Sequence, residues 1–125
     1  MKRYVQTLLF LAFCLIAIPT VNAQTGVTGI FENLTANKQS GDLDGMRVVI
    51  VSAGGGYHAI VQIAQGGADD PTPVFVPVKV KGKNIEFTVG ESKYTGIVTA
   101  AGLKLKATGG TAERLKRKSC SSYFR

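Results

Sequence analysis

The sequence predicts an all-β fold of about eight short antiparallel strands in a meander, closed into an up-and-down barrel or left as a partly open barrel or sandwich. Three observations predict it. Runs rich in valine, isoleucine, phenylalanine and threonine recur at short intervals after residue 27, glycine-containing turns separate most of them, and no apolar repeat of helical spacing follows the N-terminal segment. Because short connections favour antiparallel neighbours and closure removes exposed edges, a barrel is the simplest arrangement.

The N-terminal segment, residues 1–23, predicts a cleaved signal peptide. Two basic residues follow the initial methionine, and the apolar run over residues 8–18 is too short for a membrane-spanning helix, which needs about 20 apolar residues. Pro19 then breaks the helix, and small side chains two residues apart, ending at Ala23, mark a cleavage site. A retained anchor is the alternative, but no polar stop-transfer cluster follows the apolar run.

Cleavage after Ala23 leaves a single small β domain over residues 24–125, which we expect to be exported to the periplasm or secreted. Its one cysteine, Cys120, cannot form an internal disulfide, so the fold must rest on its hydrophobic core. Whether Cys120 pairs with another chain is left open by the sequence.

The first half of the domain contains three predicted strands. Residues 28–32 form the first, and a polar connector over residues 33–45 leads to the β-branched second strand over residues 46–51. Three consecutive glycines, residues 54–56, supply a tight turn into the third strand over residues 57–64.

The next strand, residues 74–81, shows the clearest alternation and follows an acidic, proline-containing loop over residues 65–73. Four valines are predicted to face one side, and a phenylalanine, a proline and two lysines to face the other: Val74, Val76, Val78 and Val80 against Phe75, Pro77, Lys79 and Lys81. Because Pro77 has no N–H for a sheet ladder, we expect a sheet edge or a bulge at this position.

Four strands complete the meander, over residues 85–89, 94–99, 103–106 and 112–118. Apolar residues alternate with polar or charged ones along the first and third strands of this series, which predicts an apolar interior and a charged exterior. A lipid-facing barrel needs the opposite arrangement, so we expect no membrane span after cleavage.

The first predicted strand contains Gly29-Ile30-Phe31, which resembles the Gly-x-Trp motif that opens lipocalin-like (calycin) barrels. Those barrels pack an arginine of the last strand across the tryptophan. Phe31 stands in the place of the tryptophan here, since the chain contains none, and Arg114 or Arg117 would supply the arginine. The chain is also similar to small exported bacterial proteins. The calycin resemblance implies a cup that binds a small apolar ligand.

Five aromatic residues are the candidates to line such a cup or to fill the core, namely Phe31, Tyr57, Phe75, Phe87 and Tyr94. His58 is the single histidine, and a general base needs a nucleophile or an orienting carboxylate that the sequence does not place beside it. One histidine and Cys120 are too few for a zinc site. We therefore expect neither catalysis nor a metal or other cofactor.

Positive charge is concentrated at the end of the chain. The full sequence has 15 Lys and Arg against 8 Asp and Glu, and the segment over residues 114–125 is basic without an acid. A basic run of this kind could meet nucleic acid, an anionic lipid surface or an acidic protein. The sequence favours instead a solvated edge strand and tail, in which lysine blocks unwanted strand pairing. Nucleic acid is disfavoured because the run lacks interleaved aromatic residues and because the protein is expected to be exported.

Two hypotheses of function follow. The leading one is a small exported, non-enzymatic binding module for an apolar small molecule or an envelope component. The alternative is a protein-interaction or inhibitor module that uses the loop over residues 66–73 or the basic C-terminus.

We predict that the exported protein begins at Gln24. Replacing Ala23 with phenylalanine removes the small side chain that the peptidase requires, so the A23F precursor should remain uncleaved. Intact-mass measurement and N-terminal sequencing of protein recovered from an exporting bacterial host check this, with Gln24→Asn as a control that should still be processed. A mature protein that retains residues 1–23 would contradict the prediction.

Overall fold

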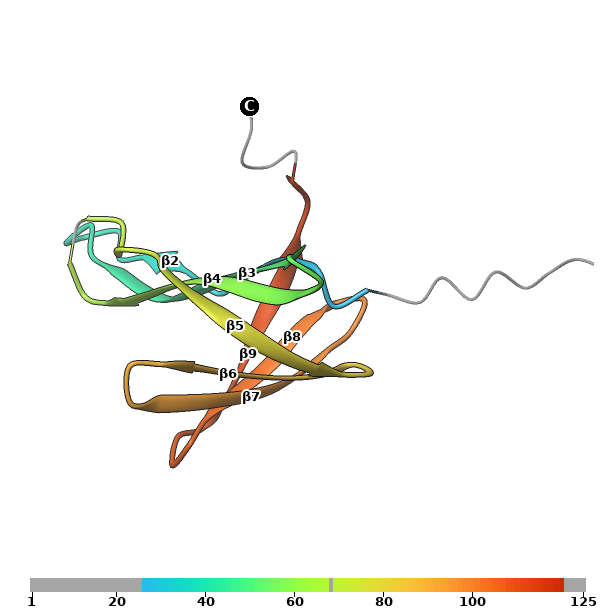
Figure 1. The fold of residues 1–125 in the computed structure, drawn as a ribbon. Helices are drawn as coiled ribbons and strands as arrows, with labels where there is room; N and C mark the ends of the chain where they lie inside the picture. The colour runs from blue at the N-terminus through green and yellow to red at the C-terminus, as the bar shows by residue number, and fades with distance from the viewer. Residues whose placement is uncertain (1–25, 68, 121–125) are drawn as a thin grey trace, which may run out of the picture.

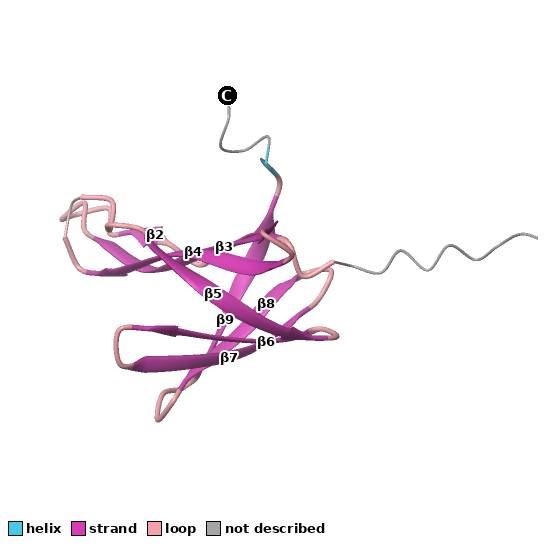
Figure 2. Ribbon diagram, in the orientation of Figure 1, coloured by secondary structure: helices cyan, strands magenta, loops and turns pink. Residues whose placement is uncertain are grey.

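The computed structural model describes residues 26–67 and 69–120 and is all-β, as predicted (Figures 1 and 2). The predicted signal peptide, residues 1–23, and the last residues of the basic segment, 121–125, lie outside this range. Within the described residues the strands are β1 (Gly29–Glu32), β2 (Thr35–Ala36), β3 (Leu43–Ala53), β4 (Gly56–Gln65), β5 (Val74–Lys81), β6 (Asn84–Val89), β7 (Ser92–Val98), β8 (Gly102–Ala107) and β9 (Ala112–Lys118).

The strands form a closed antiparallel barrel. From β3 to β9 each strand pairs with the next along the chain, and β1 completes the ring because it pairs with both β3 and β9. Ile30 of β1 lies opposite Val49 of β3 on one side and Lys118 of β9 on the other. The predicted eight-stranded meander is therefore confirmed. The two-residue β2 pairs with the first two residues of β3 and is not one of the eight strands of the ring.

The strand ends differ from the prediction mainly at β3, which begins at Leu43 instead of Met46. Asp44 and Gly45 have low strand propensity, but β2 pairs with Leu43 and Asp44 on one side, and β4 pairs with Asp44 and Gly45 on the other. The backbone of Leu43 also donates to Gly67 O (2.7 Å) and accepts from Gly66 N (3.0 Å). These pairings hold the segment extended despite its sequence, which is why the connector predicted over residues 33–45 is shorter than expected.

Pro77 lies where β5 has one partner strand. Residues 74–78 pair with β4, whereas residues 79–81 pair with β6, so the two halves of β5 contact different neighbours. Pro77 is opposite His58 in the half that pairs with β4. A residue without an N–H fits a strand position with a free side, in agreement with the predicted edge. Figure 1 shows β5 and β6 diverging from their shared turn.

The interior of the barrel is filled by apolar side chains, and none of the buried residues within the described range is polar or charged. The bulkiest of the fully buried residues come from β1, β3, β8 and β9: Phe31, Ile50, Leu103, Leu105 and Leu115. Val76 and Val78 are buried as predicted, whereas Val74 at the start of β5 is 41% exposed, although it lies opposite the buried Val61. The predicted apolar face is thus confirmed in its middle and reaches solvent at one end of the barrel.

We predict that Gly102→Ala destabilises the protein. Gly102 begins β8 opposite Lys116, and a Cβ at this position would overlap the carbonyl oxygen of Leu115 on β9. Because backbone is the obstacle, the strands must separate, at a cost of about 1–3 kcal/mol of unfolding free energy.

Urea unfolding followed by far-UV circular dichroism measures this loss, with Gly56→Ala as the matched control. A Cβ at Gly56 meets nothing within 4 Å, so that variant should stay within about 0.5 kcal/mol of the wild type. Equal stability of the two variants would show that the close approach of β8 and β9 is wrong.

Candidate functional site

The five aromatic residues proposed as ligand-binding candidates do not form one site. Phe31 and Phe87 are buried in the core, and Phe87 stacks on Tyr94 with ring centroids 5.2 Å apart. Tyr57 is partly buried against the same core. Phe75 instead lies on the outside of the barrel, 61% exposed, because it alternates with the inward-facing Val76.

Phe31 has a specific partner on the last strand. The guanidinium carbon of Arg117 lies 4.7 Å from the centroid of the Phe31 ring, and the two residues are directly opposite in the pairing of β1 with β9. Cations over aromatic faces are attracted by the ring quadrupole, most strongly where water is displaced. Of the two arginines considered in the sequence, Arg117 therefore contacts Phe31, whereas Arg114 lies opposite Lys104 on the outer face.

Arg117 also holds the N-terminal end of the described chain and the turn between β7 and β8 against β9. Its guanidinium donates to the carbonyl oxygens of Thr28 (2.9 Å), Gly26 (3.3 Å) and Thr99 (3.2 Å). Gly29 leaves room for it, since a Cβ there would lie 2.5 Å from Arg117 Nη1 and the backbone has a φ of 150°. The glycine of the Gly29-Ile30-Phe31 sequence thus has a steric role beside the arginine.

The basic run at the C-terminus consequently divides into inward and outward residues. Leu115 is buried in the core, Arg117 contacts Phe31, and Lys118 forms an ion pair of 3.4 Å with Glu32. Arg114 and Lys116 are exposed on the outer surface. Of the basic residues over 114–120, Arg114 and Lys116 are therefore the ones left to meet a partner.

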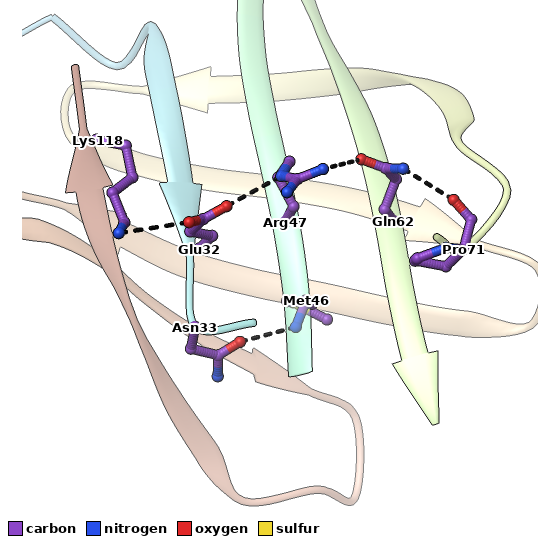
Figure 3. Close-up of polar contacts among 7 residues, drawn as sticks. All are labelled: Glu32, Asn33, Met46, Arg47, Gln62, Pro71 and Lys118. Carbon is purple, nitrogen blue, oxygen red and sulfur yellow. Dashed lines mark hydrogen bonds and ion pairs between the residues drawn. The ribbon is translucent and has the colours of Figure 1, made fainter. Parts of the chain in front are cut away.

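A chain of polar contacts crosses four strands on the outside of the barrel (Figure 3). Arg47 Nε pairs with Glu32 Oε2 at 3.0 Å, and Arg47 Nη1 donates to Gln62 Oε1 at 3.0 Å. Gln62 Nε2 in turn donates to the carbonyl oxygen of Pro71 at 2.8 Å. With the Lys118–Glu32 pair, the chain runs from β9 to the loop before β5, so the loop proposed for recognition is fastened to the barrel wall at Pro71.

A groove of about 700 Å³ lies on the outer wall formed by β5 to β9. Its walls include four lysines, one glutamate and an exposed isoleucine: Lys79, Lys81, Lys104, Lys106, Glu86 and Ile97. Ile85 and Leu105 also border it, but their side chains are buried in the core, so they contribute to its floor. The groove therefore lies on the outer wall, with core residues beneath it.

Strand register places the lysines at opposite sides of this groove. Lys81 on β5 is opposite Asn84, Asn84 is opposite Ile97, and Ile97 is opposite Lys104 on β8. With strands about 4.8 Å apart, the Cα atoms of Lys81 and Lys104 are about 14 Å apart. Ile97, which is 48% exposed, lies between them.

A second row runs parallel to the first. Lys79 is opposite Glu86, Glu86 is opposite Thr95, and Thr95 is opposite Lys106. Glu86 forms ion pairs with Lys79 (3.9 Å) and with Lys93 (3.0 Å). Four lysines against one partnered glutamate make the groove strongly positive, which raises the local concentration of anions.

The lysines of the groove were visible in the sequence only as the charged face of alternating strands. Their gathering around one groove depends on the register of the three hairpins from β5 to β8. That register cannot be deduced from the alternation of apolar and charged residues alone. Turn lengths are the signal that could have found it, because short turns restrict how hairpin strands align.

We predict that Arg117→Met destabilises the protein by about 1.5–3 kcal/mol, because methionine keeps apolar bulk but cannot donate to the three carbonyl oxygens or attract the Phe31 ring. Thermal and urea unfolding measure the change. Lys116→Met on the same strand is the control, and its exposed position should keep the change within about 0.5 kcal/mol. Similar losses in both variants would argue against a special role for Arg117.

His58, the single histidine, stacks on Phe75 with ring centroids 4.9 Å apart and an interplanar angle of 4°. Over residues 26–67 and 69–120, no three His, Cys, Asp or Glu side chains gather in a group that could hold a metal ion. Over the same ranges, no helix has the length and apolar character needed to cross a membrane. No family model matches the chain, and no curated protein or solved structure matches it significantly.

Proposed function

We propose that this chain is an exported, non-enzymatic binding module that takes up an anionic amphiphile of the cell envelope in its outer groove. The observation that carries the proposal is the groove of about 700 Å³ whose four lysines surround the exposed Ile97. Its volume is within the range of about 300–1,000 Å³ that is typical of small-molecule sites.

The chemistry of the groove fits a ligand with both charge and apolar surface. Ammonium groups attract phosphate or carboxylate, while the methylene stems of the lysines and the side chain of Ile97 offer apolar contact. A purely apolar ligand would leave the lysines without a partner, and a small inorganic anion would make no use of Ile97. An amphiphile satisfies both kinds of surface.

The interior of the barrel is the less favourable place for a ligand. The side chains of Phe31, Ile50, Leu103 and Leu105 fill it and are fully buried. A ligand in the cup implied by the calycin resemblance would have to displace some of them and lose their packing energy. Binding on the outer wall leaves the core intact.

Export supports an envelope ligand. The signal peptide predicted over residues 1–23 directs the domain to the compartment where anionic lipids and anionic polymers are exposed. The arrangement of the groove needs no chemistry beyond reversible binding, in keeping with a non-enzymatic role.

A second candidate function, a protein-interaction module, is favoured by one observation at the other end of β5. Phe75 is 61% exposed and Val74 is 41% exposed, beside the loop over residues 66–73. Exposed aromatic residues are enriched in protein interfaces. The two side chains project to opposite faces of β5 and form no continuous patch, so we place this function second.

Titration with monomeric dodecyl phosphate tests the leading proposal. In ¹⁵N–¹H correlation spectra of residues 24–125, the largest shift changes should occur at the groove, around Ile97 and Thr95. Lys104→Glu should weaken binding about fivefold or more, because it replaces attraction by repulsion at the groove. Lys38→Glu changes the net charge equally at a distant exposed turn and should have little effect.

Three results would contradict the proposal. One is the absence of saturable binding, and another is a pattern of shift changes confined to the barrel interior. The third is equal weakening by the two lysine variants, which would indicate attraction by net charge alone.

A further inference from the structure

We infer that the groove and the adjoining part of β9 dock the barrel on the surface of an anionic phospholipid bilayer, with Ile97 entering the headgroup region. This inference rests on the proposed function, since it uses the same groove and specifies the amphiphile as a phospholipid held in a membrane. We call the surface the basic face and define it by five basic residues and one isoleucine: Lys79, Lys81, Lys104, Lys106, Arg114 and Ile97.

The basic face is continuous across five strands. Lys104 of β8 is directly opposite Arg114 of β9, and residues opposite each other in a sheet project from the same side. The row that contains Lys81 and Ile97 therefore extends from β5 to β9, about 19 Å at the usual strand spacing. This width exceeds what one small anion needs and suits several headgroups side by side.

Most of the charge on this face is not neutralised within the protein. Glu86 is the acid in the groove, and its carboxylate pairs with Lys79 and with the neighbouring Lys93. Within the part of the chain that the structure describes, Lys81, Lys104, Lys106 and Arg114 form no ion pair. These four charges remain available to lipid phosphates, and each basic residue near an anionic membrane contributes about a fivefold gain in affinity.

Ile97 distinguishes a membrane from other polyanions. An aliphatic side chain at the centre of a basic surface gains from contact with acyl chains while the lysines around it hold the headgroups. Single-stranded nucleic acid is bound through aromatic side chains on which bases stack, and the basic face contains none. A single exposed isoleucine is ordinary on its own, and its place between Lys81 and Lys104 is what gives it this meaning.

The four aspartates of the chain lie away from the basic face. Asp42 and Asp44 are in or beside the start of β3, and Asp69 and Asp70 are in the loop before β5. Backbone hydrogen bonds of Leu43 with Gly66 and Gly67 join these two segments. They adjoin the first residue of β5, whereas the groove lies along its last three, about 16–23 Å further on. An anionic surface would therefore attract one side of the molecule and repel the other, which fixes its orientation.

Two tryptophan reporters test the orientation directly, because the chain contains no tryptophan of its own. Ile97→Trp places one on the basic face, and Val74→Trp places one near the acidic loops at a site that is also exposed. With residues 24–125 and vesicles of phosphatidylcholine and phosphatidylglycerol, the emission of I97W should shift to the blue and be quenched by brominated acyl chains. The emission of V74W should not change. A shift in V74W alone, or in neither variant, would overturn the inference.

The lysines are tested by co-sedimentation of tryptophan-free protein with the same vesicles. Lys104→Gln should lower the partition coefficient about fivefold, and Lys38→Gln, which removes the same charge at a distant turn, should leave it unchanged. Equal losses in the two variants, or equal binding to pure phosphatidylcholine vesicles, would overturn the docking surface.

A comparison of ligands separates this inference from the proposed function. Binding of monomeric dodecyl phosphate in the groove without binding to anionic vesicles would refute membrane docking and leave the proposed function standing. Failure to bind either would refute both. Binding to heparin or single-stranded DNA in the absence of vesicle binding would also refute membrane docking and would point to a soluble polyanion.

Discussion

The structure depends on the closure of the barrel by β1, a strand of four residues that pairs with β3 on one side and β9 on the other. So short a strand supplies few backbone hydrogen bonds, and its side chains must help to hold it between β3 and β9. We call this closure of the ring the seam. Phe31 packs into the core below Arg117, and Glu32 on the opposite face pairs with Arg47 and Lys118. The seam is therefore fastened on both faces, by an aromatic contact inside and by ion pairs outside. Without it, β3 and β9 would become exposed edges.

Closure also determines where a ligand can bind. Eight short strands enclose an interior that side chains can fill, and here leucine, isoleucine, valine and phenylalanine fill it. The groove that we propose as the binding site therefore lies on the outer wall and leaves the packed interior intact. Because neighbouring side chains of a strand point in opposite directions, one strand contributes to both the core and the outer surface. Leu105 of β8 packs inward, whereas Lys104 and Lys106 project outward.

Much of this fold could be predicted from the sequence, because alternation of apolar and charged residues reports directly on which face is buried. β5 and β9 have the predicted ends, and Pro77 lies at a position with one partner strand. β2 and the start of β3 were not predicted, because Asp44 and Gly45 are held in a strand by pairing with residues of other strands. The groove was not predicted for a related reason: Lys81 and Lys104 are 23 positions apart, and only the registers of the intervening hairpins bring them to opposite sides of Ile97.

The basic run near the C-terminus shows why charge in a sequence is a poor guide to a binding surface. In a strand, neighbouring residues project to opposite faces, so a run of basic residues cannot act as one patch. Arg117 packs over the Phe31 ring and Lys118 forms an ion pair with Glu32, and each contact contributes to closure of the barrel. Arg114 instead joins Lys104, a residue of another strand. The positive surface is thus assembled across strands, and its charges can be altered at Lys104 or Lys106 without touching the residues that hold the barrel closed.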